Sequence, residues 1–530
     1  MKTGAPPSFG AELWGRRYAI VYLALLVRLV IEIGRWHDPH TGFSSLIDFG
    51  DQFAARRVAS LSDVPLYTYA RSSGYDGQFY AQLAVAGNPL DPELDRALDS
   101  AGYRARRALL PALVHLAGLG RPAWIIQAYA LANLLCSLIL AALLARWWFP
   151  PTDLHNLLRW VGTLFGAGMM VSVTRSLTDG PALLVIALGG RMLEQNRRWL
   201  GAAILGAAGL VRETSVLCAA AFVPTTQAER RAWPRALPAA LLCLAPTFLW
   251  GAVLALHYGG GAGSRNFDLP FVSFAKKLAE IARLWHSGGF DLHTRTELFS
   301  VVALGTQAGW LLLRPKPDRV WWRIGAAFAG LLLCLGWAVW EGSPSAAARA
   351  VLPLTLAFNL IAPRTRRGLL LLLAGNLTVL SAVSIVQSIP TEQTTFGRDV
   401  TCVYSSGWHP PEHLGRRTWR WASGSAVLTL HNPTPQALSA TLDFEITSVT
   451  PRTITLHAGD DARVTDRSFV LAARKRIPGR YGPVALPPGD TTIAFSTAEP
   501  PWTESVSSGR ALTFSIHNLY VAIATQGVNP

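Results

Sequence analysis

Apolar runs of about 20 residues recur along the first three quarters of this chain, and they constrain its fold more than any other feature. A helix of about that length crosses the hydrocarbon core of a bilayer. The 530 residues are 50% hydrophobic and only 15% charged, whereas a soluble domain carries about a quarter charged residues. The runs predict about eleven membrane spans: 18–34, 121–146, 157–174, 179–194, 199–211, 213–224, 236–257, 297–313, 320–340, 347–362 and 368–388.

The distribution of arginine predicts how these spans are oriented. The formal net charge is +15, and much of it lies in short loops between the apolar runs, which marks such loops as cytoplasmic. A cytoplasmic N-terminus and a helix break at Arg212 place all the basic clusters inside, namely those at Arg197, Arg230, Arg314 and Arg364. A single span over 199–224 would turn the last three clusters outward. We therefore expect a break at Arg212 and an outside C-terminus.

Two of the expected outside loops are long, 35–120 and 258–296. The first contains eight aspartates, among them those at positions 38, 48, 51, 76, 91 and 95. Its apolar stretch 108–114 is too short to span a bilayer, and 274–285 in the second loop carries its apolar residues near one helical face. Both stretches are predicted to be helices that lie on the membrane surface.

The pattern changes near Thr401, where apolar and polar residues begin to alternate in short runs. The runs are 426–431, 440–446, 453–456, 492–495, 512–516 and 519–523, and turns rich in Asn, Pro, Gly and Asp separate them. This spacing predicts an all-β sandwich or jelly roll of about 120 residues. The chain is thus expected to be a polytopic α-helical membrane domain over 1–395, followed by a β-sandwich domain over 396–530 outside the membrane.

Four motifs carry a resemblance to a known family. In chain order they are Gly74-Tyr75-Asp76-Gly77-Gln78-Phe79-Tyr80 with Tyr103 to Pro111; Thr178-Asp179-Gly180 with Leu210 to Thr214; Arg349-Ala350-Val351-Leu352-Pro353; and Gly407 to Glu412 with Trp419-Arg420-Trp421. In this order they resemble bacterial integral-membrane glycosyltransferases of the GT-C superfamily, in a branch with an appended β-domain.

The resemblance implies a function and a location. The chain is expected to be an inverting glycosyltransferase in the bacterial cytoplasmic membrane. It would move a sugar from a polyprenyl-phosphate donor to a glycan, lipid or protein acceptor on the outer face. Only Asp76 is strongly placed, without the adjacent second acid common in the superfamily, and none of the twelve His has metal-ligand spacing. No metal site or cofactor is therefore expected, and a divalent metal is possible but not supported. Since the excess positive charge lies in loops between the apolar runs, no nucleic-acid partner is expected either.

Asp76 is the expected general base, because transfer requires a group that takes the proton from the acceptor hydroxyl. A helix over 75–84 would place Asp76 and Tyr80 on one face, with Tyr75 and Phe79 on an apolar stripe. The alternative is that Asp76 is a turn or N-cap residue beside Gly77.

Arginines are the expected ligands of the donor phosphate, because a guanidinium fork matches phosphate oxygens. The full set of expected substrate-binding residues is Tyr75, Gln78, Tyr80, Arg104, Arg107, Asp179, Arg212, Glu213 and Arg349. Each has an alternative role. The arginines of 104–107 would suit ordinary lipid head groups, Arg212 could form a structural pair with Glu213 or Asp179, and Asp179 could cap a helix.

Two other function classes remain open from the sequence. A transporter or flippase of lipid-linked sugars would need several charges facing a midplane cavity. A non-catalytic envelope protein would bind glycan through the β-domain alone. In that domain Trp408, Trp419 and Trp421 could stack on sugar rings or pack the domain.

Overall fold

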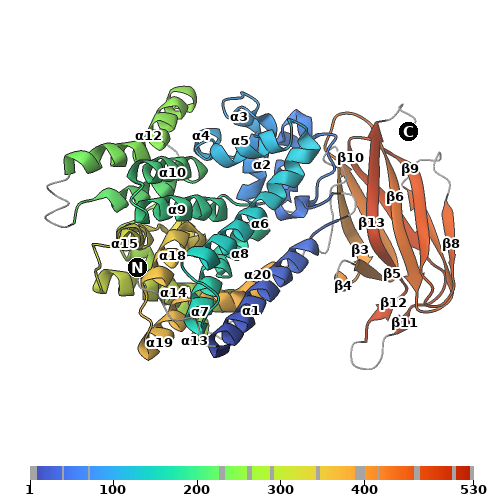
Figure 1. Ribbon diagram of the computed structural model, residues 1–530. Coiled ribbons are helices and arrows are strands. Elements are labelled where there is room, and N and C mark those ends of the chain that lie inside the picture. Colours follow the sequence, from blue (N-terminus) through green and yellow to red (C-terminus); the bar gives the residue numbers. More distant parts are fainter. Residues whose placement is uncertain are drawn as a thin grey trace.

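The computed structural model describes residues 9–38, 41–69, 72–225, 233–259, 266–286, 292–341, 346–387, 400–414, 417–458, 466–503 and 509–525. Within these residues a helical domain is followed by a β-rich domain, and the two lie side by side (Figure 1). The expected domain boundary at 395/396 and the basic cluster at Arg230 lie outside the described residues.

Each expected span contains helix. The longer helices are α1 (Phe9–Gly34), α6 (Pro122–Trp147), α7 (Leu154–Leu164), α8 (Ala167–Thr174), α9 (Asp179–Glu194), α10 (Arg198–Val211), α12 (Trp233–Tyr258), α14 (Leu292–Leu313), α15 (Val320–Cys334), α18 (Leu352–Ile361) and α19 (Arg366–Gly375). Shorter helices are α16 (Trp337–Trp340), α17 (Ala346–Ala350) and α20 (Ala382–Gln387). The 3₁₀ segments η4 (Glu213–Phe222) and η6 (Leu377–Ser381) complete the expected spans.

Fewer of these helices are long enough to span a membrane than the sequence predicts. Among the described residues, three helices are long and apolar enough to cross a membrane, within α6, α12 and α14, and up to five segments qualify if each bent pair counts as one. The bent pairs are α7 with α8, and α19 with the segment that follows it. These helices indicate a membrane protein. The number of about eleven spans stays a prediction, because the other elements are shorter or broken.

The first expected outside loop is folded rather than extended. It contains the helices α2 (Asp76–Ala86), α3 (Leu94–Ala97), α4 (Ala101–Arg104) and α5 (Leu109–Ala117), the 3₁₀ turns η1 (Ser44–Leu46), η2 (Asp51–Arg56) and η3 (Ala59–Leu61), and the parallel pair β1 (Phe49–Gly50) and β2 (Thr68–Tyr69). The expected helix over 75–84 is confirmed by α2. The expected helices over 108–114 and 274–285 are confirmed by α5 and by α13 (Val272–His286), and their place at the membrane surface stays a prediction.

The expected break at Arg212 is confirmed. α10 ends at Val211, Arg212 has an extended backbone with φ −150° and ψ 122°, and η4 begins at Glu213. α9 and α10 pack closely because Gly189 of α9 has no side chain, and a Cβ there would lie 2.7 Å from the Leu205 side chain. Since the two helices are antiparallel neighbours, the start of α9 and the end of α10 meet at one end of the domain.

The described basic loops gather at the opposite end. Glu194, the last residue of α9, accepts hydrogen bonds from the indoles of Trp148 and Trp321, and Thr225 donates to the Pro317 carbonyl. The sixteen residues of α9 rise about 24 Å at 1.5 Å per residue. The Arg197 and Arg314 clusters are therefore separated from Arg212 by most of a bilayer core, as the expected topology requires.

The β-rich domain follows the expected alternation. Its strands are β3 (Thr401–Trp408), β4 (Glu412–Leu414), β5 (Arg417–Asn432), β6 (Leu438–Ser448), β7 (Arg452–Ala458), β8 (Arg467–Leu471), β9 (Ile477–Leu486), β10 (Gly489–Ser496), β11 (Trp502–Thr503), β12 (Ala511–Leu512) and β13 (Phe514–Thr525). The main sheet runs β8-β7-β10-β5-β13-β6-β9, and β3 and β4 also pair with β5. Every second residue of β6 is buried, which gives the domain a core of its own.

The long strand β5 joins two antiparallel halves of this sheet. Its C-terminal part pairs with β10 and its N-terminal part with β13. Side chains from the two halves meet in the core, where the rings of Phe444 on β6 and Phe495 on β10 lie 6.3 Å apart. Trp408 packs into the same core, 5.7 Å from Phe495 and from Phe514. A named sandwich or jelly-roll fold stays a prediction, as does glycan binding by the tryptophans.

The first loop and the β-domain leave the helical domain at the same place. The Trp36 indole, just after α1, donates to the Val386 carbonyl near the end of α20 at 3.1 Å. Figure 1 shows the β-domain beside the end of α1 and the folded first loop. An outside first loop therefore implies an outside β-domain.

Cysteine labelling tests this topology. In a variant without the five native cysteines, an impermeant thiol reagent added to intact cells should label Ser62→Cys in the first loop. The reagent should label Gln195→Cys, after α9, only once the membrane is permeabilised. Both positions are exposed, so lack of access reflects the membrane and not burial. Labelling of Gln195→Cys in intact cells would contradict the orientation.

Candidate active site

The Gly74–Gln78 motif folds a tight turn that presents Asp76 at the first position of α2. Gly74 has φ +67°, a conformation that glycine adopts without strain. Gly77 lies so close to a neighbouring segment that a Cβ would meet the Arg175 carbonyl oxygen at 2.3 Å. Gln78 is fully buried and accepts a hydrogen bond from the Gly50 N–H at 3.2 Å, while it donates to the Ser73 carbonyl at 2.6 Å. The hydrogen bonds of the buried Gln78 side chain thus stabilise the turn.

Asp76 lies between two arginines from distant parts of the chain. One carboxylate oxygen is 3.0 Å from Arg104 of α4, and the other is 3.4 Å from Arg349 of α17. Burial by itself would raise the pKa of Asp76, but the positive charges of Arg104, Arg349 and Arg107 hold this pKa well below its usual range. The N-cap position is Tyr75, and no side chain caps the helix. The Asp76 carboxylate is therefore ionised and points at arginines.

Tyr80 lies one turn after Asp76, as expected, and it joins the two arginines of the first loop. Its hydroxyl accepts hydrogen bonds from Arg104, at 3.1 Å, and from Arg107. Arg107 also forms a two-pronged pair with Glu213 at 2.7 and 2.8 Å. This pair ties the first loop to the residue that follows the break in the chain at Arg212.

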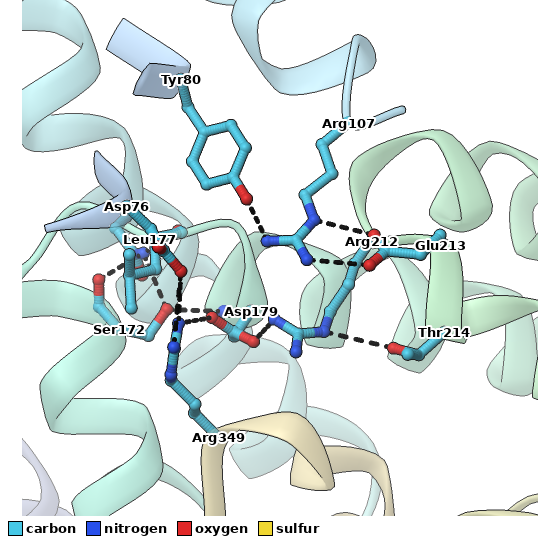
Figure 2. A network of polar contacts seen from close by, with 12 residues as sticks. Asp76, Tyr80, Arg107, Ser172, Leu177, Asp179, Arg212, Glu213, Thr214 and Arg349 are labelled. Atoms are coloured by element: carbon cyan, nitrogen blue, oxygen red, sulfur yellow. Dashed lines mark hydrogen bonds and ion pairs between the residues drawn. The ribbon is translucent and has the colours of Figure 1, made fainter. Parts of the chain in front are cut away.

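A second carboxylate, Asp179, lies between Arg212 and Arg349 (Figure 2). It is the first residue of α9, its side chain is 1% exposed, and it pairs directly with Arg212. Arg349 lies 3.5 Å from its other oxygen, so Arg349 is shared between Asp76 and Asp179. The helix N-terminus adds a favourable partial charge for the carboxylate. The expected structural pair of Arg212 with Asp179 is present, whereas Glu213 pairs with Arg107 instead.

These groups open onto one cavity of about 580 Å³. Its charged wall contains, among the described residues, five arginines and two carboxylates: Arg104, Arg106, Arg107, Arg212, Arg349, Asp76 and Glu213. The remaining wall is largely apolar and is formed by Phe267, Leu331, Leu335, Ala338, Val339 and neighbouring alanines. The cavity therefore combines strong positive potential with a greasy surface.

Most of the expected site residues line this cavity, and three do not. Tyr75, Asp76, Arg104, Arg107, Arg212, Glu213 and Arg349 form part of its wall. Gln78, Tyr80 and Asp179 lie behind it, where they position the turn and the arginines. No three His, Cys, Asp or Glu come together as a metal site within the part of the chain that the structure describes.

Tyr103 and Asn266 are among the lining residues that were not foreseen as site residues. The Tyr103 hydroxyl accepts from Arg107 at 3.3 Å and from the Asn266 amide at 3.4 Å. Tyr103 stands directly before Arg104 in the second half of the first-loop motif, so its place in the motif was a signal. Asn266 stands in the second long loop, and nothing in the local pattern marks it.

Comparisons with known proteins give distant similarities only. No protein-family model and no curated protein matches the chain. The cryo-EM structure of the arabinosyltransferase EmbB from Mycobacterium smegmatis matches with 10% identity and a TM-score of 0.34, over 95% of this chain and 64% of that one. The structure of TmCBM61 in complex with β-1,4-galactotriose matches with 17% identity and a TM-score of 0.14, over 23% of this chain and 80% of that one. The chain thus spans less than two thirds of EmbB, and at such scores neither similarity bears on its function.

The buried pair of Arg107 and Glu213 predicts a measurable coupling. Their side chains are 5% and 21% exposed, and removing one member of a buried pair costs about 3–5 kcal/mol. Arg107→Met and Glu213→Met should each lower the free energy of unfolding in a denaturant titration in detergent. The double variant should lose less than the sum, by about 1–3 kcal/mol. Strict additivity would show that the two charges do not stabilise each other.

Proposed function

We propose that this chain is an integral-membrane glycosyltransferase of the GT-C type. It transfers a sugar, with inversion, from a polyprenyl-phosphate donor to a glycan, lipid or protein acceptor at the outer face of the bacterial cytoplasmic membrane. The observation that carries the proposal is the cavity itself. It places one ionised carboxylate, Asp76, among guanidinium groups on one wall and an apolar surface on the other.

The charged wall suits a phosphate that leaves with its lipid. The Arg349 guanidinium lies 3.4 Å from the Asp76 carboxylate and 3.5 Å from the Asp179 carboxylate. Both distances are longer than those of charge-assisted hydrogen bonds, about 2.7–2.9 Å. Phosphate oxygens in the cavity would therefore compete well for this guanidinium. Positive charge aimed at the departing phosphate stabilises the transition state in a site that needs little rearrangement.

The apolar wall suits the polyprenyl chain. Phe267, Leu331 and Leu335 face the cavity beside the charged groups. Each buried CH₂ contributes about 0.8 kcal/mol to binding, so even a few isoprenoid carbons in this part would hold the donor firmly. A soluble nucleotide-sugar would leave this surface without a partner.

Asp76 then serves as the general base. The acceptor hydroxyl gives its proton to the Asp76 carboxylate as its oxygen forms a bond to the anomeric carbon. The bond from that carbon to the phosphate oxygen breaks, and polyprenyl phosphate leaves with the electron pair. Donor phosphate that draws Arg349 away from Asp76 removes a charge that holds its pKa low. Donor binding thus makes Asp76 a stronger base.

The position of the charges favours an enzyme over a transporter. Asp76 begins α2 in the first loop, Asp179 begins α9, and Arg212 follows the end of α10. All three lie at the end of the domain opposite the described basic loops. A transporter needs its charges near the middle of the membrane, where both sides can reach them.

Replacement of Asp76 tests the base. Transfer is measured from a panel of radiolabelled polyprenyl-phosphate sugars into membrane extracts. Asp76→Asn should lower the rate by about two to four orders of magnitude, the usual contribution of a positioned base. Asp99→Asn is the matched control, because Asp99 also pairs with Arg104, at 2.7 Å, but does not line the cavity. Near-normal turnover by Asp76→Asn would refute the assignment, and absence of transfer from every donor would refute the reaction.

The pH profile tests the coupling to Arg349. Because Asp76 is ionised in the free protein, kcat/KM should stay constant down to about pH 4, below which even an ordinary Asp begins to protonate. The profile of kcat reports the complex with donor, in which Arg349 contacts phosphate, so its acidic limb should lie at higher pH. Coincident limbs, or a kcat/KM limb near pH 6, would contradict the mechanism.

A further inference from the structure

A second cavity of about 330 Å³ lies beside the first, between α4 and the last two turns of α12. Its wall includes Asp95, Ser100, Gly251 and Tyr258. We call it the side groove. In the expected topology α12 ends outside, so the groove opens at the same face of the membrane as the first loop.

The side groove exists because one face of α12 carries small residues. Gly251 and Ala255 are one turn apart and both line it. A Cβ at Gly251 would meet nothing within 4 Å, so the space there is open. Tyr258 closes the end of the groove, and its hydroxyl donates to the Pro89 carbonyl at 2.7 Å, which fixes the ring.

The groove and the main cavity share a wall. Tyr103 and Arg106 line both. The Tyr103 ring is surrounded by the guanidinium groups of Arg104, Arg106 and Arg107, at 5.4, 5.5 and 5.6 Å. A molecule that lies in the groove is therefore separated from the charged cavity by the shared residues Tyr103 and Arg106.

The chemistry of the groove fits a neutral sugar better than a phosphate or a lipid tail. Two tyrosines offer aromatic surface, while Asp95, Ser100 and Arg106 offer acceptors and donors for hydroxyl groups. The Asp95 carboxylate would repel a phosphate, and a lipid tail would leave the polar groups without partners.

We propose that the side groove binds the acceptor glycan, at the sugar next to the one that receives the transferred residue. This inference rests on the proposed function. The donor enters the main cavity from its apolar side, and the acceptor reaches across Tyr103 so that its hydroxyl meets Asp76. The protein then selects acceptors of at least two sugars, and Tyr103 and Arg106 contact both substrates.

The test uses the full-length protein in nanodiscs with octyl monosaccharide and octyl disaccharide acceptors. Gly251→Leu adds side-chain volume to the groove at a position where a Cβ meets nothing within 4 Å. Gly309→Leu on α14 is the matched control, because a Cβ there also meets nothing within 4 Å and Gly309 lines neither cavity. The native protein should have a KM for the disaccharide about tenfold below that for the monosaccharide, equivalent to about 1.4 kcal/mol. Gly251→Leu should lose this preference with an unchanged donor KM, and Gly309→Leu should keep it.

Two kinetic outcomes overturn the groove as an acceptor site. One is that Gly251→Leu keeps the native disaccharide preference. The other is that Gly251→Leu raises the donor KM, which would assign the groove to the donor lipid. Saturation-transfer NMR with the octyl disaccharide measures binding without turnover. Signals from the second sugar that are present in the native protein and lost in Gly251→Leu would support the groove. If such signals appear but no sugar is transferred from any donor, the proposed reaction fails and the groove stands. Absence of these signals in the native protein refutes the groove alone.

Discussion

The arrangement of the candidate site depends on one buried carboxylate, Asp179. It is 1% exposed and lies against Arg212 and Arg349, which come from segments more than a hundred residues apart. A buried charge without a partner is strongly destabilising. Asp179 pairs with both arginines, and Arg349 also pairs with Asp76. These ion pairs hold the guanidinium groups of Arg212 and Arg349 at the edge of the cavity. Asp179 is not among the residues that line the cavity, and substrate binding by Asp179 stays a prediction.

The same logic places the site at helix ends. Backbone groups at a helix end are not satisfied within the helix, and polar side chains there cost less than in the middle of an apolar span. Asp76 begins α2, Asp179 begins α9, and Arg212 follows α10. The extended conformation at Arg212 lets Glu213 turn toward Arg107, so the break joins the first loop to the membrane helices. The break between α10 and η4 thus brings residues of the first loop and of the helical domain to one cavity.

The two cavities differ in the chemistry of their walls. The main cavity offers apolar residues of α15 and the loop before α13, and the side groove offers hydroxyl-binding groups of the first loop and α12. Tyr103 stands between them. The β-domain leaves the helical domain at the same end, through the contact of Trp36 with the Val386 carbonyl.

The sequence by itself determined the local features of this protein. Helical periodicity placed Tyr80 on the face of Asp76, charge sorting located the break at Arg212, and alternation marked the strands of the β-domain. Tertiary structure alone decided which charges meet, because Arg107 pairs with Glu213 across 106 residues and no local pattern records such a distance. The tertiary structure also decided that Gln78 is buried behind the turn and that Trp408 packs in the core of the β-domain. Burial depends on neighbours from distant parts of the chain, which the local sequence does not reveal.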